Sequence, residues 1–434
     1  MMSLGSSGGL PLLLGHGLGD AGDLPVALPV VLFLAAGSVL LGAWWGDRRP
    51  APSGGEDSGR PLPRLTAFAD ARATRAVLRT LTVAGLVIVI ATAALGPATA
   101  AGNPSSRLVF VLFWGLLIPV SLLFGRVWRA VNPYRTIANG LARLAGDPEW
   151  NTALPLPQGI GTWPAVVQLA LFVWAVIGAS ERSGQVLVVV LALTAVQLLA
   201  ANRYGPAWFR HGDPFEVVAD LVASVSPLGR GPDGVLVLRR PVASARRMRL
   251  DAGVPVVIAL LIGGYLTDFT VDTPLLHELR APYGRTGQVL VDTLVLAALT
   301  AVVLGAIVAV TRRVRFLLPA LVPVAAGYAL AHDFGVLVVE GQFAFIQLSD
   351  PLGRGWDLLG LTGRYVPMEP IPAVIASVVV VLVLVAGHVA AVLLGRSLVG
   401  ARFSGRTATA VQLRLRAFLV VSVIAGIALR LIVA

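Results

Sequence analysis

The stretch FLLPALVPVAAGYALAHDFGVLVVEG, residues 316–341, is long and apolar enough to cross a lipid bilayer as one helix. Three ionisable side chains lie toward its far end, namely His332, Asp333 and Glu340. Charge at that depth is costly and rarely occurs without a partner or a function. A step of about 100° per residue places Asp333 roughly 100° and Glu340 roughly 80° around the helix from His332. We therefore predict that the three side chains share one side of this helix.

The composition of the whole chain also indicates a membrane location. Of its 434 residues, 56% are hydrophobic and 13% are charged, whereas soluble proteins have about 25% charged residues. The 34 basic residues are all arginine and give a net charge of +11. Because they lie between apolar runs, we interpret them as topology signals and do not expect a nucleic-acid partner. The chain has no cysteine, which excludes disulfides and thiolate chemistry.

Before and after residues 316–341 in the sequence, similar apolar runs recur along the chain. They predict an all-α polytopic membrane protein with about ten spans, in which 1–23 is an extracytoplasmic segment and 24–434 is a single membrane domain. The apolar run 10–14 is short for a signal peptide and follows no positive residue, so it is not a convincing secretory signal, and a truncated or misassigned start is the alternative. The predicted spans are 24–45, 80–101, 107–125, 161–179, 185–201, 252–269, 287–311, 316–341, 372–395 and 416–434.

The arginines orient these spans. Alternate connections hold 27 arginines, and the opposite side holds six. Because positive loops stay in the cytoplasm, both termini should face outward. Twelve acidic residues fall on the outward side or in the outward halves of spans, which favours a cation or a proton there. The alternative is that acids contribute little to topology and collect where arginine is absent.

Two predicted cytoplasmic connections share a motif. NPY at 132–134 and DPF at 213–215 each follow a tryptophan closely. Asn132 and Asp213 suit a helix N-cap, Pro133 and Pro214 suit the first helical position, and Glu216 would complete a capping box. We predict two short amphipathic helices along the inner membrane surface. The likeness is either an internal repeat, as transporters often have, or convergent helix-start chemistry.

One further cytoplasmic segment has a turn signal. In GRGPDGVLVLRR, 229–240, a Pro-Asp-Gly turn precedes a short apolar run. Such a pattern predicts a hairpin-like bend.

The acids near the outer ends of other spans extend the candidate site. Asp268 and Asp292 fall at a depth similar to that of His332, and Asp350 in the outward loop 349–357 is placed to approach Glu340. The functional hypothesis is an outward-facing polar cavity, and the alternative is polar contacts that hold helices together. The predicted cavity residues are Asp268, Asp292, His332, Asp333, Glu340 and Asp350.

Histidines raise the question of a cofactor. A divalent metal ion held by His332, Glu340 or His16 is one alternative, although the glycine-rich sequence around His16 is more typical of a loop than of a helix. A haem between His332 and His388 is disfavoured, because the predicted depths of the two histidines in the membrane differ by roughly 14 Å. Gly387, Ala391 and Gly395 form a small-residue ridge, so we expect His388 to take part in helix packing or a local hydrogen bond.

Five stretches of the chain resemble, in order and almost end to end, a family of bacterial multi-pass membrane proteins often labelled fenitrothion hydrolase. They are HGLGDAGDLP, VWRAVNPYRTIA, WFRHGDPFEVVADLVASVSPLGR, AHDFGVLVVEGQ and LSDPLGRGWDLLG. The resemblance implies a bacterial cytoplasmic (inner) membrane location and cleavage of an aryl phosphotriester. That reaction commonly uses a metal-activated hydroxide, which the outward histidine and carboxylates would have to supply. The family commonly has an aromatic residue where this chain has Asp333.

Three functional hypotheses follow. The first is a transporter-like protein that handles a small solute, a proton or a cation through the outward cavity. The second is a membrane-embedded, metal-assisted hydrolase. The third is a scaffold in the bilayer that docks a cytoplasmic protein through the two cap-Pro-aromatic helices. The substrate, the catalytic residues, if any, and the oligomeric state do not follow from the sequence.

Overall fold

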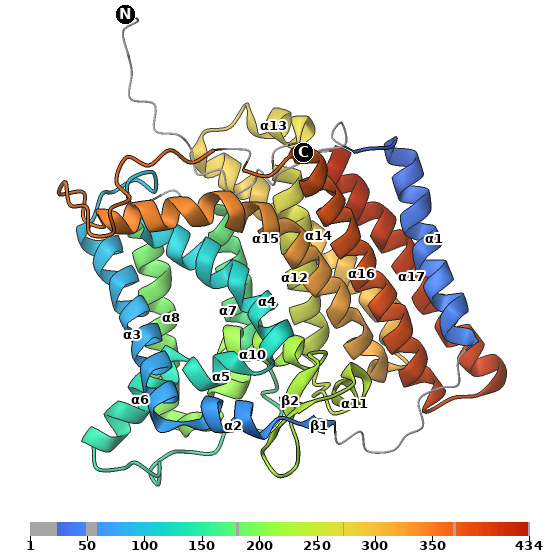
Figure 1. The fold of residues 1–434 in the computed structure, drawn as a ribbon, viewed down its shortest axis with the longest axis horizontal. Helices are drawn as coiled ribbons and strands as arrows, with labels where there is room; N and C mark the ends of the chain where they lie inside the picture. The colour runs from blue at the N-terminus through green and yellow to red at the C-terminus, as the bar shows by residue number, and fades with distance from the viewer. Residues whose placement is uncertain (1–23, 49–58, 179–181, 272, 368–369, 433–434) are drawn as a thin grey trace, which may run out of the picture.

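The computed structural model describes residues 24–48, 59–178, 182–271, 273–367 and 370–432. Most of this chain is helical (Figure 1). The long helices are α1 (Leu28–Asp47), α3 (Arg72–Leu95), α4 (Trp114–Phe124), α7 (Trp163–Gly178), α8 (Ser183–Tyr204), α12 (Val254–Val271), α14 (Arg285–Thr311), α15 (Leu318–Ser349), α16 (Ala373–Gly400) and α17 (Gly405–Ile432). The shorter ones are α2 (Pro63–Asp70), η1 (Arg107–Phe113, a π-helix), α5 (Val127–Val131), α6 (Pro133–Leu144), η2 (Gly205–Ala207), α9 (Phe209–Gly212), α10 (Pro214–Ala223), α11 (Pro241–Ala245), α13 (Pro274–Arg280) and η3 (Arg315–Leu317).

Length and hydropathy identify the helices that can cross a membrane. Within the described residues, eight are long and apolar enough, and α12 with α13 would make a ninth if this pair, bent by 84°, is one span. Helix α7 is apolar but has only 16 residues. The prediction of an all-α chain with many helices long and apolar enough to span a membrane is therefore confirmed, and each predicted apolar run overlaps a helix. The count of ten spans and their orientation stay predictions.

The helices form two groups joined by α15 (Figure 1). One group contains α3, α4, α7 and α8 with the short helices α5, α6 and α10, and the other contains α1, α12, α14, α16 and α17. Helix α15 has 32 residues, a length of about 48 Å, which exceeds the roughly 30 Å of a hydrocarbon core. Its first part packs on α16, and its last part crosses over the first group, where Gln347 Nε2 donates to Ala100 O at 2.9 Å.

Glycine allows α15 and α16 to approach closely. A Cβ atom on Gly387 would lie 2.6 Å from Pro323 O, and one on Gly395 would lie 2.2 Å from the Leu415 side chain of α17. Ala391 is fully buried. Small residues at these positions let the backbones of neighbouring helices meet. The predicted small-residue ridge on α16 is thus confirmed.

The two predicted helix caps form, and they meet each other. Asn132 accepts from the N–H of Arg135 at the start of α6, and Asp213 accepts from the N–H groups of Phe215 and Glu216 at the start of α10. Pro133 and Pro214 are the first residues of these helices, as predicted. The Nδ2 group of Asn132 also donates to Asp213 Oδ2 at 2.6 Å. The span before each motif packs on the short helix of the other motif, so that α4 contacts α10 and α8 contacts α6. An internal repeat would produce this exchange of partners. The repeat itself stays a prediction.

The predicted position of the second short helix is wrong. Every residue of α10 except Asp220 is buried, so this helix lies inside the bundle and not along the membrane surface. The valine, leucine and phenylalanine side chains lie on one side of it. The opposite side is covered as well, because Glu216 pairs there with Arg135. Glu216 does not complete a capping box either, because both of its carboxylate oxygens accept from Arg135 at 2.6 Å.

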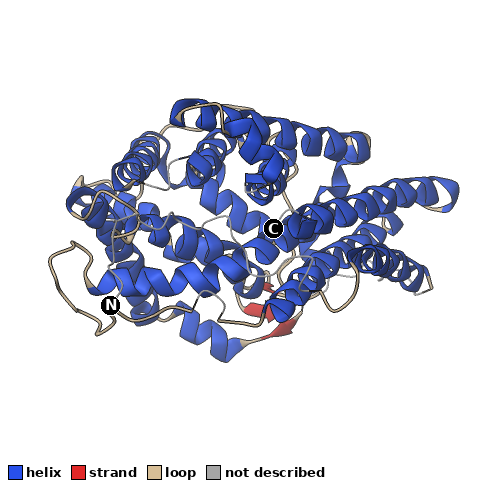
Figure 2. Ribbon diagram, turned by 90° about the horizontal axis from the view of Figure 1, so that it is seen from above, coloured by secondary structure: helices blue, strands red, loops and turns tan. Residues whose placement is uncertain are grey.

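A small antiparallel sheet (Figure 2) lies at the predicted cytoplasmic side, at the bottom of Figure 1. The strands β2 (Leu228–Arg230) and β3 (Leu236–Leu238) form the predicted hairpin, and β1 (Arg60–Pro61) pairs with β3. Arg230 and Arg75 both bind the carboxylate of Asp70 and lower the pKa of this group to about 2. These contacts attach the hairpin to α2.

Candidate functional site

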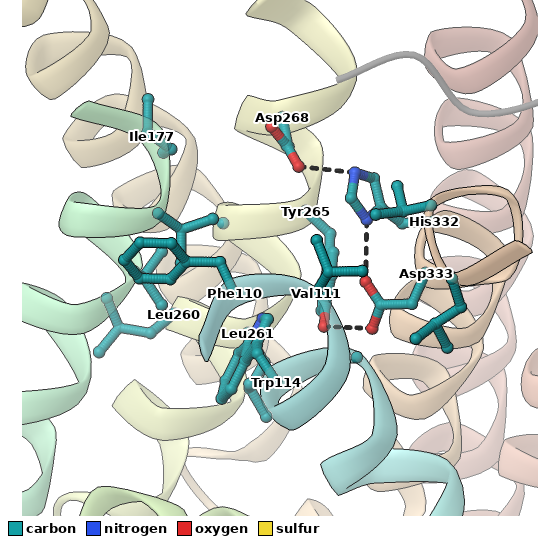
Figure 3. Close-up of a pocket in the computed structure, with 16 residues that line it drawn as sticks. Phe110, Val111, Trp114, Ile177, Leu260, Leu261, Tyr265, Asp268, His332 and Asp333 are labelled. Atoms are coloured by element: carbon teal, nitrogen blue, oxygen red, sulfur yellow. Dashed lines mark hydrogen bonds and ion pairs between the residues drawn. The ribbon is translucent and has the colours of Figure 1, made fainter. Parts of the chain in front are cut away.

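The central feature is a histidine held between two carboxylates. His332 and Asp333 are consecutive on α15, and Tyr265 and Asp268 lie three residues apart, on one face of α12. His332 Nε2 lies 2.6 Å from Asp268 Oδ2, and His332 Nδ1 lies 3.0 Å from Asp333 Oδ1. The hydroxyl group of Tyr265 donates to Asp333 Oδ2 at 3.0 Å. Figure 3 shows the four side chains in one continuous line.

The charge of this cluster follows from its geometry. A carboxylate oxygen lies within 3.0 Å of each ring nitrogen of His332, and two carboxylates this close favour the doubly protonated, cationic ring. With Asp268 and Asp333 ionised, the cluster has one excess negative charge. The exposed fraction of the side chain is 7% for His332, 7% for Asp333 and 15% for Asp268. An excess charge so well shielded from water attracts a proton or a small cation.

A small cavity opens beside the cluster, between the two groups of helices. Its volume is about 30 Å³, which is room for one or two water molecules. Polar groups of Tyr265, Asp268, His332 and Asp333 line one side, and apolar side chains line the rest (Figure 3). The apolar lining residues include Phe110, Trp114, Val173, Leu261 and Val336.

Sequence reasoning missed Tyr265, Trp114 and the π-helix that adjoins them. Tyr265 lies three residues before Asp268, and helical spacing would have placed it on the same face. Helix η1 carries Phe110 into the cavity and passes directly into α4, which carries Trp114. Short π-helical segments often occur at functional sites, but the sequence of η1 does not distinguish it from α-helix.

Glu340 does not join the histidine cluster. Its carboxylate pairs with Arg107 at 2.6 Å, and both side chains are buried. The prediction considered only the angle between the side chains around the axis of α15. Along that axis, Glu340 lies eight residues from His332, a distance of about 12 Å. Glu340 thus lies where α15 crosses η1. The pair connects the two groups of helices.

The other predicted cavity residues also have partners of their own. Asp292 on α14 pairs with Arg280 on α13. Asp350 accepts from the backbone N–H groups of Arg354 and Gly355 at 2.8 and 2.7 Å and so organises its own loop. Only Asp268, His332 and Asp333 of the six predicted residues line the cavity. The expectation that all six surround one cavity is therefore wrong, because ion pairs and loop contacts hold the others elsewhere.

His388 is separate from this cluster. His388 is fully buried; its Nδ1 lies 2.7 Å from Leu384 O and its Nε2 lies 3.0 Å from Ser422 Oγ. The predicted local hydrogen bond of His388 is confirmed. His16 lies outside the described residues. Among the residues that are described, no three His, Asp or Glu side chains are arranged to hold a metal ion.

The fold and the site define a class: a helical protein with eight helices, among the described residues, long and apolar enough to span a membrane, and a buried histidine–carboxylate cluster between α12 and α15. Comparison with known proteins adds no narrower assignment, because no family model, curated protein or solved structure matches this chain. The resemblance to the proteins labelled fenitrothion hydrolase therefore stays a prediction.

Proposed function

We propose that this protein is a transporter-like membrane protein that takes up and releases a proton at Asp268, His332 and Asp333. The observation that carries the proposal is the position of the His332 ring, 2.6 Å from one carboxylate and 3.0 Å from another. Histidine beside carboxylates is a chemistry typical of proton relays in membrane proteins.

The size of the cavity favours a proton over a larger solute. Space of about 30 Å³ admits one or two water molecules, whereas ligand pockets for small organic molecules measure roughly 300 Å³ or more. A metal cation would need several oxygen ligands around it, and the ring of His332 stands between the two carboxylates. One proton neutralises the excess charge without displacing any side chain.

The connectivity of the cluster supports a relay. Asp268 is the most exposed of the three ionisable groups, and the line continues through His332 and Asp333 to the hydroxyl of Tyr265. Each neighbour is within hydrogen-bonding distance. A proton received at Asp268 can therefore pass to the His332 ring and on to Asp333 by successive exchange, while the Tyr265 hydroxyl donates a hydrogen bond to Asp333.

The test is proton movement in proteoliposomes with an entrapped pH indicator and an imposed potassium diffusion potential. Wild-type protein should change the internal pH faster than empty liposomes. His332→Gln should reduce this rate roughly 100-fold, the scale on which positioned acid–base groups act. The matched control is His388→Gln, which replaces another buried histidine that lies outside the cluster.

A second measurement covers a transporter that moves protons only together with a solute. Infrared spectra across a pH titration should contain a buried carboxylic acid signal in wild type that Asp268→Asn or Asp333→Asn removes. Two outcomes would overturn the proposal. One is an equal proton flux in wild type and His332→Gln. The other is a wild-type flux no faster than in empty liposomes, combined with the absence of the infrared carboxylic acid signal.

A further inference from the structure

A second cavity lies at the other end of the molecule, between the end of α14 and the start of α17. Its volume is about 640 Å³, within the usual range for ligand sites. Four arginines line it. Arg312 and Arg313 directly follow α14, and Arg406 and Arg414 lie on α17.

The arginines on α17 share one face of the helix. Arg406, Ala410 and Arg414 recur every four residues and all line the cavity, so the two guanidinium groups belong to one stripe about 12 Å long. Apolar side chains, among them Val310, Val314 and Phe403, complete the wall. The cavity thus combines four positive charges with an apolar surface.

Neighbouring arginines have partners, whereas these four have none among the described residues. Arg396 and Arg416 pair with Asp47, and Arg402 stacks over the ring of Phe316. In the described part of the chain, no carboxylate bonds to the side chains lining this cavity. Four adjacent positive charges repel one another, and an anion between them would relieve that repulsion.

We propose that this cavity binds the phosphate-bearing headgroup of an anionic phospholipid. Arginine forms paired hydrogen bonds with phosphate oxygens, and basic pockets between spans on the cytoplasmic side suit such headgroups. Helix α14 ends and α17 begins at this cavity, on the side that the arginine distribution predicts to be cytoplasmic. The ends of spans lie at the level of the lipid headgroups. The apolar wall formed by Val310, Val314 and Val411 is suited to the start of an acyl chain.

The experiment is native mass spectrometry of purified protein after exchange into detergent with phosphatidylglycerol or phosphatidylcholine. Wild type should retain phosphatidylglycerol in preference to phosphatidylcholine. The variant Arg406→Gln with Arg414→Gln should lower the retained fraction roughly tenfold or more, because each arginine near a headgroup contributes to its attraction. The control Arg143→Gln with Arg203→Gln removes the same charge from exposed positions elsewhere on this side and should bind as wild type does.

A third arm separates lipid from a soluble anion. Inorganic phosphate is titrated into delipidated protein, and thermal stability is measured. Stabilisation by millimolar phosphate that the α17 variant abolishes, without selective retention of phosphatidylglycerol, would replace the lipid with a soluble phosphate compound. Equal retention of both lipids, or an equal loss in the control variant, would also overturn the proposal.

Discussion

At the residue scale, the described chain separates its buried charges into distinct groups. The carboxylate of Glu340 has a guanidinium partner in Arg107, whereas Asp268 and Asp333 share the single ring of His332. A balanced ion pair is a structural contact, because neither charge remains to be neutralised. A cluster with excess charge is suited to chemistry that changes with proton binding.

Replacing Glu340 with glutamine should destabilise the protein. The change leaves the buried Arg107 guanidinium without a counter-charge, because the glutamine amide and the Ala100 carbonyl are neutral acceptors. Breaking a buried ion pair in this way costs about 3–5 kcal/mol. Thermal unfolding in detergent measures the loss. Glu278→Gln, at an exposed acid, serves as control and should unfold as wild type does. If Glu340→Gln melts at the wild-type temperature, the pair does not hold α15 on η1.

At the element scale, the contact between α15 and α16 depends on glycine. Helix α15 carries His332, and Gly387 of α16 lies directly against the backbone of α15 at Pro323 and Gly327. Any side chain at residue 387 would meet backbone atoms, which cannot move aside as a flexible side chain can.

Gly387→Ala should therefore destabilise the protein by about 1–3 kcal/mol, the usual effect of overpacking. Gly305→Ala on α14 is the matched control, because nothing lies within 4 Å of the added methyl group; helix propensity should make this variant slightly more stable. The unfolding temperatures of the two variants should shift in opposite directions. A rise for both would mean that α15 and α16 pack less closely than described.

At the scale of the whole molecule, the cavity beside His332 lies between the two groups of helices. The lining residues from η1, α4 and α7 belong to one group, those from α12 to the other, and α15 joins the two. Relative movement of the groups would change the access of water to Asp268. The orientation of the whole bundle in the membrane decides from which side that water comes.

Cysteine labelling tests this orientation, and the absence of native cysteine makes every introduced one unique. Leu358→Cys lies in the exposed loop after α15, and Pro232→Cys lies at the turn of the hairpin. A membrane-impermeant maleimide should label the first in intact cells and the second only after permeabilisation, because arginine-rich connections remain in the cytoplasm. The opposite labelling pattern would invert the predicted topology.

The sequence alone determined the elements whose signals are local. Apolar runs predicted the positions of the long helices, Asn132 and Asp213 predicted two helix starts, and the small residues from Gly387 to Gly395 predicted a close helix contact. Each signal depends on residues a few positions apart, whose geometry the backbone period fixes.

The tertiary structure alone decided which polar groups meet. It placed Tyr265 with Asp333 across 68 positions of sequence and Arg107 with Glu340 across 233, and it buried α10, which sequence had assigned to the membrane surface. Helical periodicity gives the direction of a side chain around its own axis. It does not give the neighbour that packing brings to that face, and the partner of each buried charge depends on that neighbour.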